Sequence, residues 1–178
     1  QGEEEVDMHF KTFRSVFPYT MGWMSVANEI LIIGSDQPIQ IDFNKLKVRL
    51  EEPEIKKALA DIEIPNIFSF LSNIWLLDDQ IQALGEGHPL ITDNHPAIEF
   101  YLDLGNVIDV SGREKYVFNR ASFDQVANHI ENLSAADRRL LKPYYDAMDL
   151  YQRGVMYSNR GQLLKALNML EDNNLVRY

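Results

Sequence analysis

The chain of 178 residues contains no cysteine, and this absence removes several kinds of chemistry at once. Disulfide bonds, thiolate metal sites and cysteine nucleophiles are all excluded. Long apolar runs are missing too. The longest, from Ile67 to Leu77, is well short of the roughly 20 residues that a membrane helix needs. We therefore expect no membrane insertion by this chain and a cytoplasmic location.

Positive charge is scarce. The chain has 17 basic and 27 acidic residues, which gives a formal net charge of -10 at pH 7. A field of this sign repels phosphate backbones, and no local cluster of lysine or arginine opposes it. We therefore expect no nucleic-acid partner. Solubility alone accounts for such a charge, and attraction of a cationic substrate is the alternative.

The common nucleotide and nucleophile motifs are absent as well. The sequence has no GxGxxG, no GxxxxGK[ST] and no GxSxG. The glycine pair Gly85 and Gly87 follows a predicted helix and precedes His-Pro, the opposite of the context that a dinucleotide loop requires. We assign no catalytic residue and expect no cofactor bound by this chain alone.

The first half mixes strand and helix patterns. After a flexible leader over residues 1–9, Phe10 to Phe17 alternates loosely between apolar and polar residues, which is typical of a strand with one exposed face. Glu29 to Gly34 is a continuous β-branched run, typical of a strand covered on both faces. The two segments predict an antiparallel hairpin at one side of a sheet. Because an isolated pair of strands is only marginally stable in water, we expect this sheet to contain further strands.

Helix signals follow the second predicted strand. Asp42 is placed to cap a helix over residues 43–50, and Pro53 suits the first turn of the next helix. Helices are predicted through residues 67–85, with Gly85 and Gly87 as left-handed caps. We expect a short strand at Ile98 to Leu102 and a linker or irregular segment over residues 105–112.

The last third is predicted to be helical. Two helix starts have capping spacing, Ser122 with Gln125 and Ser134 with Asp137. Pro143 is expected to kink or restart the second of these helices. Five residues lie at offsets that resemble a single tetratricopeptide helix hairpin: Gly154, Tyr157, Gly161, Ala166 and Leu170.

These elements predict an α+β fold in which a hairpin completes a sheet packed by helices, followed by an all-helical subdomain. The division is a leader over residues 1–9, a mixed domain over residues 10–105 and a helical subdomain over residues 106–178.

Three motifs, taken in order, carry a family resemblance: SVFPYTMGWMS, then EILIIGSDQPIQID, then ITDNHPAIEFYL after paired helices. This order resembles the C-terminal portion of the spermidine-synthase-like family, over about residues 10–103, particularly bacterial members fused to transporter-like membrane segments. The resemblance implies a Rossmann-like, methyltransferase-type sheet of seven strands. Phe10 to Phe17 and Glu29 to Gly34 would be its terminal hairpin.

The resemblance also implies a substrate and a partner. Spermidine synthases wall their polyamine site with a P-x-Y-P-x-G-x-W stretch, and here Pro18, Tyr19 and Trp23 belong to a shorter version that lacks the second proline. Asp93 and Glu99 are further candidate substrate-binding residues. An S-adenosyl-type donor would be bound by the upstream Rossmann-like half, which is the expected partner together with a homo-oligomer. The resemblance implies that the parent protein is an aminopropyl- or methyl-transferase and, in the fused members, membrane-associated.

Two other functions compete with this interpretation. Tyr144, Tyr145, Tyr151 and Tyr157 lie on neighbouring helical turns and favour a non-catalytic interaction module, since tyrosine is enriched at interfaces; packing of the helix hairpin is the plainer explanation. A metal-dependent hydrolase ranks third. It would use His88, Asp93, His95 and Glu99, whose spacing matches no helix-borne metal motif, so we expect no metal.

Overall fold

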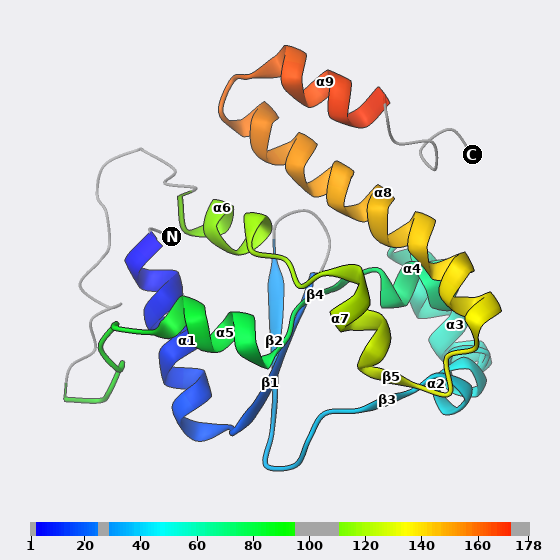
Figure 1. Ribbon diagram of the computed structural model, residues 1–178, viewed down its shortest axis with the longest axis horizontal. Helices are drawn as coiled ribbons and strands as arrows, with labels where there is room; N and C mark the ends of the chain where they lie inside the picture. The colour runs from blue at the N-terminus through cyan, green and yellow to red at the C-terminus, as the bar shows by residue number, and fades with distance from the viewer. Residues whose placement is uncertain (1–2, 25–28, 95–110, 172–178) are drawn as a thin grey trace. The chain divides into compact units, whose positions relative to one another are not determined.

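The computed structural model describes residues 3–24, 29–94 and 111–171 (Figure 1). Helices and strands are mixed along the described chain, and the predicted α+β class is confirmed. The helices are α1 (Glu3–Val16), α2 (Phe43–Leu50), α3 (Pro53–Asp61), α4 (Ile67–Leu71), α5 (Asp78–Gly85), α6 (Ser111–Phe118), α7 (Phe123–Asn128), α8 (Ala135–Asn159) and α9 (Leu163–Glu171). The strands are β1 (Tyr19–Met24), β2 (Ile30–Ser35), β3 (Ile41–Asp42), β4 (Ile74–Leu76) and β5 (Ile130–Glu131). No helix among the described residues combines the length and the apolar character needed to cross a membrane.

The strands form two small sheets. An antiparallel sheet has the order β2-β1-β4, and β3 pairs in parallel with β5. Strand β4 is fully buried, whereas β2 lies at an edge and exposes Leu31 by 53% and Ile33 by 42%. The prediction of a strand covered on both faces is therefore wrong for β2 in the described chain.

The prediction of a strand from Phe10 to Phe17 is also wrong, because this segment belongs to helix α1 and to the turn that follows it. Val6, Phe10, Phe13 and Phe17 are spaced by four, three and four residues, which is the helical period and not the strand period. The expected leader starts the same helix, with Val6 and Met8 buried. The neighbouring antiparallel strands are instead β1 and β2, further along the chain.

A second correction concerns residues 67–85. The apolar run splits into the short helix α4, the buried strand β4 and helix α5, where only helices were expected. Gly85 is the last residue of α5, and Gly87 adopts the left-handed conformation with a φ of 80°. Only Gly87 therefore has the backbone angle that the capping prediction requires.

The predicted helix starts are confirmed. The Asp42 side chain accepts a hydrogen bond from the N–H of Lys45, and Pro53 lies in the first turn of α3. Ser122 and Ser134 accept hydrogen bonds from the N–H groups of Gln125 and Asp137. Helix α8, however, continues through Pro143 without restarting.

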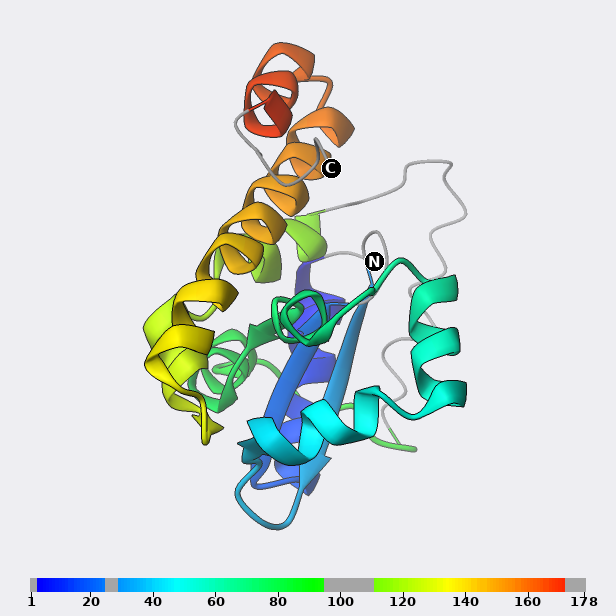
Figure 2. The same ribbon diagram turned by 90° about the vertical axis from the view of Figure 1, so that its right-hand side faces the viewer.

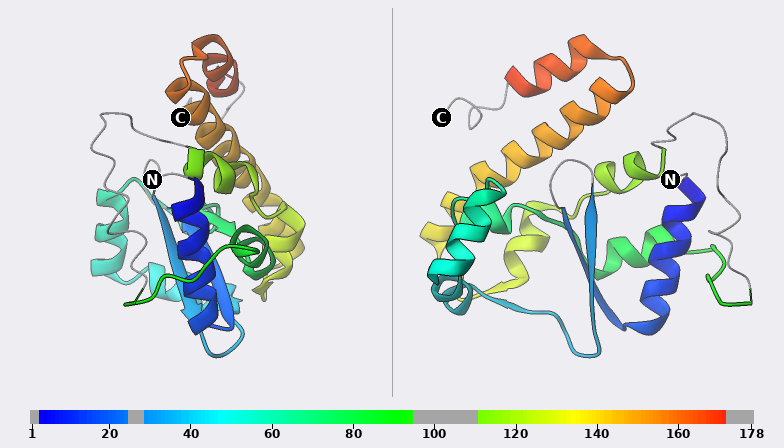
Figure 3. Two further views of the ribbon diagram at one scale, coloured as in Figure 1. Left: turned by 90° about the vertical axis from the view of Figure 1, so that its left-hand side faces the viewer. Right: turned by 180° about the vertical axis from the view of Figure 1, so that it is seen from behind.

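The chain divides into two compact units. The first contains residues 1–22, 32–39 and 76–120, and in it α1 packs against α5 and α6 (Figure 3). The α1–α5 contact is close because Gly85 has no side chain: a Cβ atom there would lie 2.8 Å from the backbone nitrogen of Lys11.

The second unit contains residues 23–31, 40–75 and 121–178. Helix α4 packs on α8, and α9 folds back over the last turns of α8 (Figure 2). Gly154 and Ala166 are buried, as the tetratricopeptide-like hairpin predicts. The predicted strand at residues 98–102 and the predicted boundary near residue 105 lie outside the described residues.

Candidate functional site

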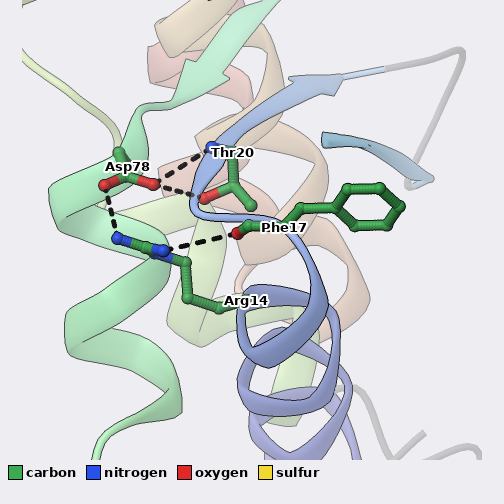
Figure 4. A network of polar contacts seen from close by, with 4 residues as sticks. All are labelled: Arg14, Phe17, Thr20 and Asp78. Carbon is green, nitrogen blue, oxygen red and sulfur yellow. Dashed lines mark hydrogen bonds and ion pairs between the residues drawn. The ribbon is translucent and has the colours of Figure 1, made fainter. Parts of the chain in front are cut away.

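A polar clamp holds the turn that carries two of the predicted site residues (Figure 4). Asp78, at the start of α5, accepts hydrogen bonds through Oδ1 from the backbone N–H of Thr20 at 3.0 Å and from its hydroxyl at 2.7 Å. The other oxygen, Oδ2, pairs with Arg14 Nη2 at 2.9 Å. Arg14 also donates from Nη1 to the carbonyl oxygen of Phe17 at 3.3 Å. The turn between α1 and β1 is thus held on both sides.

The clamp is partly shielded from water. The side chains of Arg14 and Asp78 are 26% and 34% exposed, and Thr20 is buried. Asp78 also lies in the first turn of its helix, where the helix dipole favours a negative charge. A half-buried, charge-assisted network of this kind is stronger than an exposed ion pair. It fixes the backbone on both sides of Pro18 and Tyr19.

Pro18 and Tyr19 are presented to solvent by this clamped turn. Pro18 is exposed and Tyr19 is 38% exposed, so both are accessible to a ligand. Tyr19 begins β1, and its neighbour Thr20 points inward to Asp78. A tyrosine ring on a rigid backbone loses little freedom when it stacks on a flat or cationic group.

Trp23, the second aromatic residue of the predicted substrate wall, is packed within the second unit. Its indole N–H donates to the carbonyl oxygen of Phe70 at 3.1 Å, and the two rings lie 5.3 Å apart. The side chain is half-buried. These contacts give Trp23 a structural role in the packing of α4 within the second unit, whereas Pro18 and Tyr19 belong to the first unit.

The predicted acidic and metal-binding residues are only partly described. Asp93 is exposed in a turn, whereas His95 and Glu99 lie outside the described residues. Within the ranges that the structure describes, no group of three histidine, aspartate or glutamate side chains could hold a metal ion.

Sequence analysis did not identify a buried aspartate that pairs with two basic side chains. Asp7 in α1 is fully buried, and its Oδ2 pairs with Lys115 of α6 and with His88 Nε2 at 3.2 Å. Its Oδ1 is buried without a hydrogen-bond partner. The only local signal is an aspartate between the apolar residues Val6 and Met8, and its partners are far along the chain. These pairs stabilise the packing of α1 against α6, because removing one partner leaves a buried charge uncompensated.

The interaction tyrosines of α8 differ in accessibility. Tyr145 is buried and donates to the carbonyl oxygen of Ala121, and Tyr144 packs on Phe68 with ring centres 5.9 Å apart. The ring of Tyr157 lies beneath the Lys165 ammonium at 3.9 Å. Tyr151 is 36% exposed.

One small cavity in the second unit contains none of the predicted site residues. It has a volume of about 80 Å³ and lies between α2, α3 and the start of α4. Leu50, Leu59 and Ile67 contribute apolar lining, and Lys47 and Lys56 contribute charge. Its volume is well below the roughly 300 Å³ at which small-molecule pockets begin.

Comparisons with known proteins give no match: no family model, no curated protein and no solved structure resembles this chain.

Proposed function

We propose that this chain is the C-terminal, substrate-side portion of a spermidine-synthase-like transferase. In this role it contributes a wall of the substrate site and an assembly surface, while the catalytic groups and the S-adenosyl-type donor belong to an upstream Rossmann-like half. The reaction of the parent would be displacement at a sulfonium carbon by an amine, for which positioning and proton removal dominate catalysis.

The observation that supports the proposal is the apolar edge strand of the three-stranded sheet. Strand β2 lies at the sheet edge and exposes Leu31 and Ile33 on one side. An apolar edge strand is a template for pairing with another strand, and stable native proteins cover or charge such edges. The order of a helix followed by two antiparallel neighbours, α1, β1 and β2, also fits the end of a methyltransferase-type sheet. Upstream strands would cover this edge and complete the fold.

Tyr19 is the residue best placed to act as a substrate wall. It is accessible, and the Asp78 clamp fixes its backbone. A tyrosine face over an alkylammonium group contributes about 0.5 to 2 kcal/mol. Asp93, also exposed, would add long-range attraction for the same cation.

The sequence encoded immediately before Gln1 tests the proposal directly. A strand ending in a glycine-rich turn would support the proposed function, and a segment without any Rossmann-like pattern would contradict it. Where that segment is present, calorimetry should show S-adenosylmethionine binding to the longer protein and none to the 178-residue chain. Donor binding by the 178-residue chain itself would contradict the assignment.

The Tyr19→Ala variant of the longer protein tests the substrate wall. Spermidine affinity should fall by about 2- to 30-fold, the equivalent of the cation contact. Donor affinity should stay unchanged. The control is Tyr151→Ala, which removes a similarly exposed tyrosine from α8 and should affect neither ligand.

An interaction module is the second candidate, favoured by a separate observation. Helix α9 exposes three leucines, Leu163, Leu164 and Leu167, which a helix facing only water does not need. This function requires no transferase activity.

A further inference from the structure

The small cavity of the second unit is a pocket with leucine in its lining and charged side chains beside it. Lys47, Leu50 and Glu51 contribute to it from one side of α2 and its C-terminal cap, since Leu50 and Glu51 follow Lys47 by three and four positions. Lys56 and Leu59, three positions apart, contribute to it from α3. Each helix thus supplies a leucine and an ammonium group. We call this cavity the α2–α3 pocket.

The turn that ends α3 fixes one wall of the α2–α3 pocket. Glu63 has a left-handed backbone with a φ of 60°. The N–H of Ile64 donates to the carbonyl oxygen of Leu59 at 2.8 Å, and the N–H of Glu63 donates to that of Ala60 at 3.1 Å. These two bonds define a Schellman cap, which folds the residue after the left-handed one back towards the last turn of the helix. Ile64 and Leu59 both line the pocket.

Asn66 fixes the next part of the lining. Its Oδ1 accepts hydrogen bonds from the N–H groups of Phe68 and Ser69, both at 2.9 Å, and its Nδ2 donates to the Tyr144 hydroxyl at 3.2 Å. Pro65, immediately before it, has a restricted φ. The pocket is therefore preformed, and a ligand that enters it has few protein groups to order.

The size of the pocket suits one aliphatic side chain. Its volume is about 80 Å³. An apolar cavity of about 150 Å³ accepts a benzene molecule, and sites for free small molecules begin at roughly 300 Å³. A pocket of this size fits the anchoring side chain of a larger partner, as in the side-chain pockets at the centre of protein interfaces.

Lys47 gives the pocket a positive charge without a counter-ion. The other two cations of α2 each have a carboxylate partner: Lys45 lies 3.8 Å from Asp42, and Arg49 lies 3.1 Å from Glu52. Lys47 has no such partner among the residues that the structure describes. It is exposed, so its ammonium group is accessible to an anion.

The second ammonium group of the pocket is compensated only at the surface. Lys56 pairs with Glu51 at 2.7 Å, and the two side chains are 59% and 66% exposed. Exposed pairs of this kind contribute little and rearrange readily. With two ammonium groups and one carboxylate, the local charge is positive, although the chain as a whole has a net charge of -10. At about 0.15 M salt the Debye length is about 8 Å, so the nearest charges dominate.

We propose that the α2–α3 pocket binds an acidic segment of a partner protein through one leucine or isoleucine side chain, and that carboxylates flanking this anchor pair with Lys47 and Lys56. The pocket supplies the apolar contact, and the charges around it select an acidic partner over a basic one. The proposal is independent of the transferase function, because it uses residues of the second unit only.

A peptide titration tests the proposal on the unmodified 178-residue chain. The probe is a short fluorescein-labelled peptide in which one leucine is flanked on both sides by glutamate. Fluorescence polarisation should show saturable binding with a dissociation constant of about 0.1 to 1 mM. Alanine in place of the leucine should weaken binding by at least about 10-fold, because the apolar anchor is lost. Absence of binding by the glutamate peptide up to about 2 mM would overturn the proposal.

A peptide with lysine in place of glutamate distinguishes the pocket from the overall charge. The net charge of -10 favours the lysine peptide, whereas the α2–α3 pocket favours the glutamate peptide. We expect the lysine peptide to bind at least about 5-fold more weakly, and added salt to weaken binding of the glutamate peptide. Tighter binding of the lysine peptide, or stronger binding of the glutamate peptide in salt, would contradict the proposal.

The anchor preference tests the size of the pocket. A glutamate peptide with tryptophan in place of leucine should bind more weakly, because an indole ring exceeds a cavity of about 80 Å³. Tighter binding of the tryptophan peptide would place the contact elsewhere and overturn the proposal. Sedimentation distinguishes another occupant: a dimer of the chain that excess glutamate peptide disperses would assign the pocket to a second copy, which would also overturn it.

The Lys47→Glu variant locates the contact. It reverses the charge of the ammonium group without a counter-ion and should weaken binding of the glutamate peptide by about 3- to 10-fold. The matched control is Lys57→Glu, which makes the same change in net charge at an exposed position of α3 outside the lining. This control should change the affinity by less than about 2-fold. Circular dichroism establishes that both variants fold. Equal losses in the two variants would assign the attraction to overall charge and would overturn the proposal.

Discussion

Asp78 accepts both hydrogen bonds of Thr20 through a single carboxylate oxygen, although the two residues are 58 positions apart in the sequence. The backbone N–H and the hydroxyl of Thr20 converge on Oδ1, which leaves Oδ2 for Arg14. This division of the carboxylate couples the start of β1 to the start of α5. It also sets the conformation of the turn that presents Tyr19.

Replacement of Asp78 with alanine should lower the free energy of unfolding by about 2 to 4 kcal/mol. The substitution leaves the buried N–H and hydroxyl of Thr20 without their acceptor and leaves Arg14 unpaired with Asp78. Urea denaturation followed by circular dichroism measures the loss. Asp79→Ala, at the exposed neighbouring position, should cost less than about 1 kcal/mol. Similar losses for both variants would contradict the clamp.

Truncation of Trp23 should lower the free energy of unfolding much more than truncation of Tyr19. Trp23→Ala removes the ring packed on Phe70 and should cost about 3 kcal/mol of stability. Tyr19→Ala, at an accessible position, should change the free energy of unfolding by no more than about 0.5 kcal/mol. Urea midpoints at a constant denaturant slope distinguish the two. A large loss for Tyr19→Ala would assign that ring to packing and not to a ligand wall.

The variants Gly85→Ala and Gly87→Ala should both lose stability, but for different physical reasons. Gly85→Ala introduces a Cβ atom 2.8 Å from the backbone nitrogen and 2.9 Å from the Cα of Lys11, which forces α1 and α5 apart. We expect a loss of about 1 to 3 kcal/mol. Gly87→Ala meets no neighbouring atom within 4 Å but must keep its left-handed angle, which costs about 1 kcal/mol. Thermal unfolding should rank Gly85→Ala as the less stable variant.

The stability of helix α2 should depend on pH through Asp42. The hydrogen bond from the Lys45 N–H, against some opposing desolvation, lowers the pKa of Asp42 below its ordinary value of 3.8. Because the folded pKa is the lower one, this contribution is present above the ordinary value and is lost as the pH falls through the lowered pKa.

The Asp42→Asn variant checks this dependence. Asparagine keeps the capping oxygen but has no charge, so the variant should be less stable than the parent at neutral pH and equally stable in strong acid. Thermal midpoints between about pH 2 and about pH 7 provide the measurement. Asp42→Ala loses the cap and should be destabilised at every pH. A constant difference between the parent and Asp42→Asn would refute the ionic contribution.

Helix starts could be predicted from the sequence because each depends on residues within one turn. Asp42, Pro53, Ser122 and Ser134 act on N–H groups two or three positions away or on the local backbone angle. The segment Phe10 to Phe17 shows the opposite case. Its aromatic residues fit both a loose alternation and the helical period, and packing against α5 and α6 decides for the helix.

The boundary between helix α4 and strand β4, within the apolar run from Ile67 to Leu77, was harder to predict from the sequence. Ile74 to Leu76 is a continuous apolar stretch that is buried throughout, so no periodicity separates a buried strand from a helix. Pairing with β1, which includes the hydrogen bond from the Met24 N–H to the Asn73 carbonyl oxygen at 2.7 Å, selects the extended form.

The candidate site was predictable only in part. Tyr19 was singled out by its motif, whereas its support by Asp78 joins distant segments that carry no shared local signal. The same applies to Asp7, whose partners follow it by 81 and 108 positions.

The Asp7–Lys115 pair also constrains the order in which the first unit is built. Helix α1 is synthesised before α6, yet its buried carboxylate does not meet Lys115 until a further 108 residues have been added. At about 5 to 20 residues per second, this length corresponds to roughly 5 to 20 seconds of translation. During that interval the Asp7 carboxylate lacks this partner, and contact with water is favoured over burial. A product that ends before Lys115 should therefore hold α1 against α5 less tightly than the full chain does, because the buried Asp7 then lacks one of its partners.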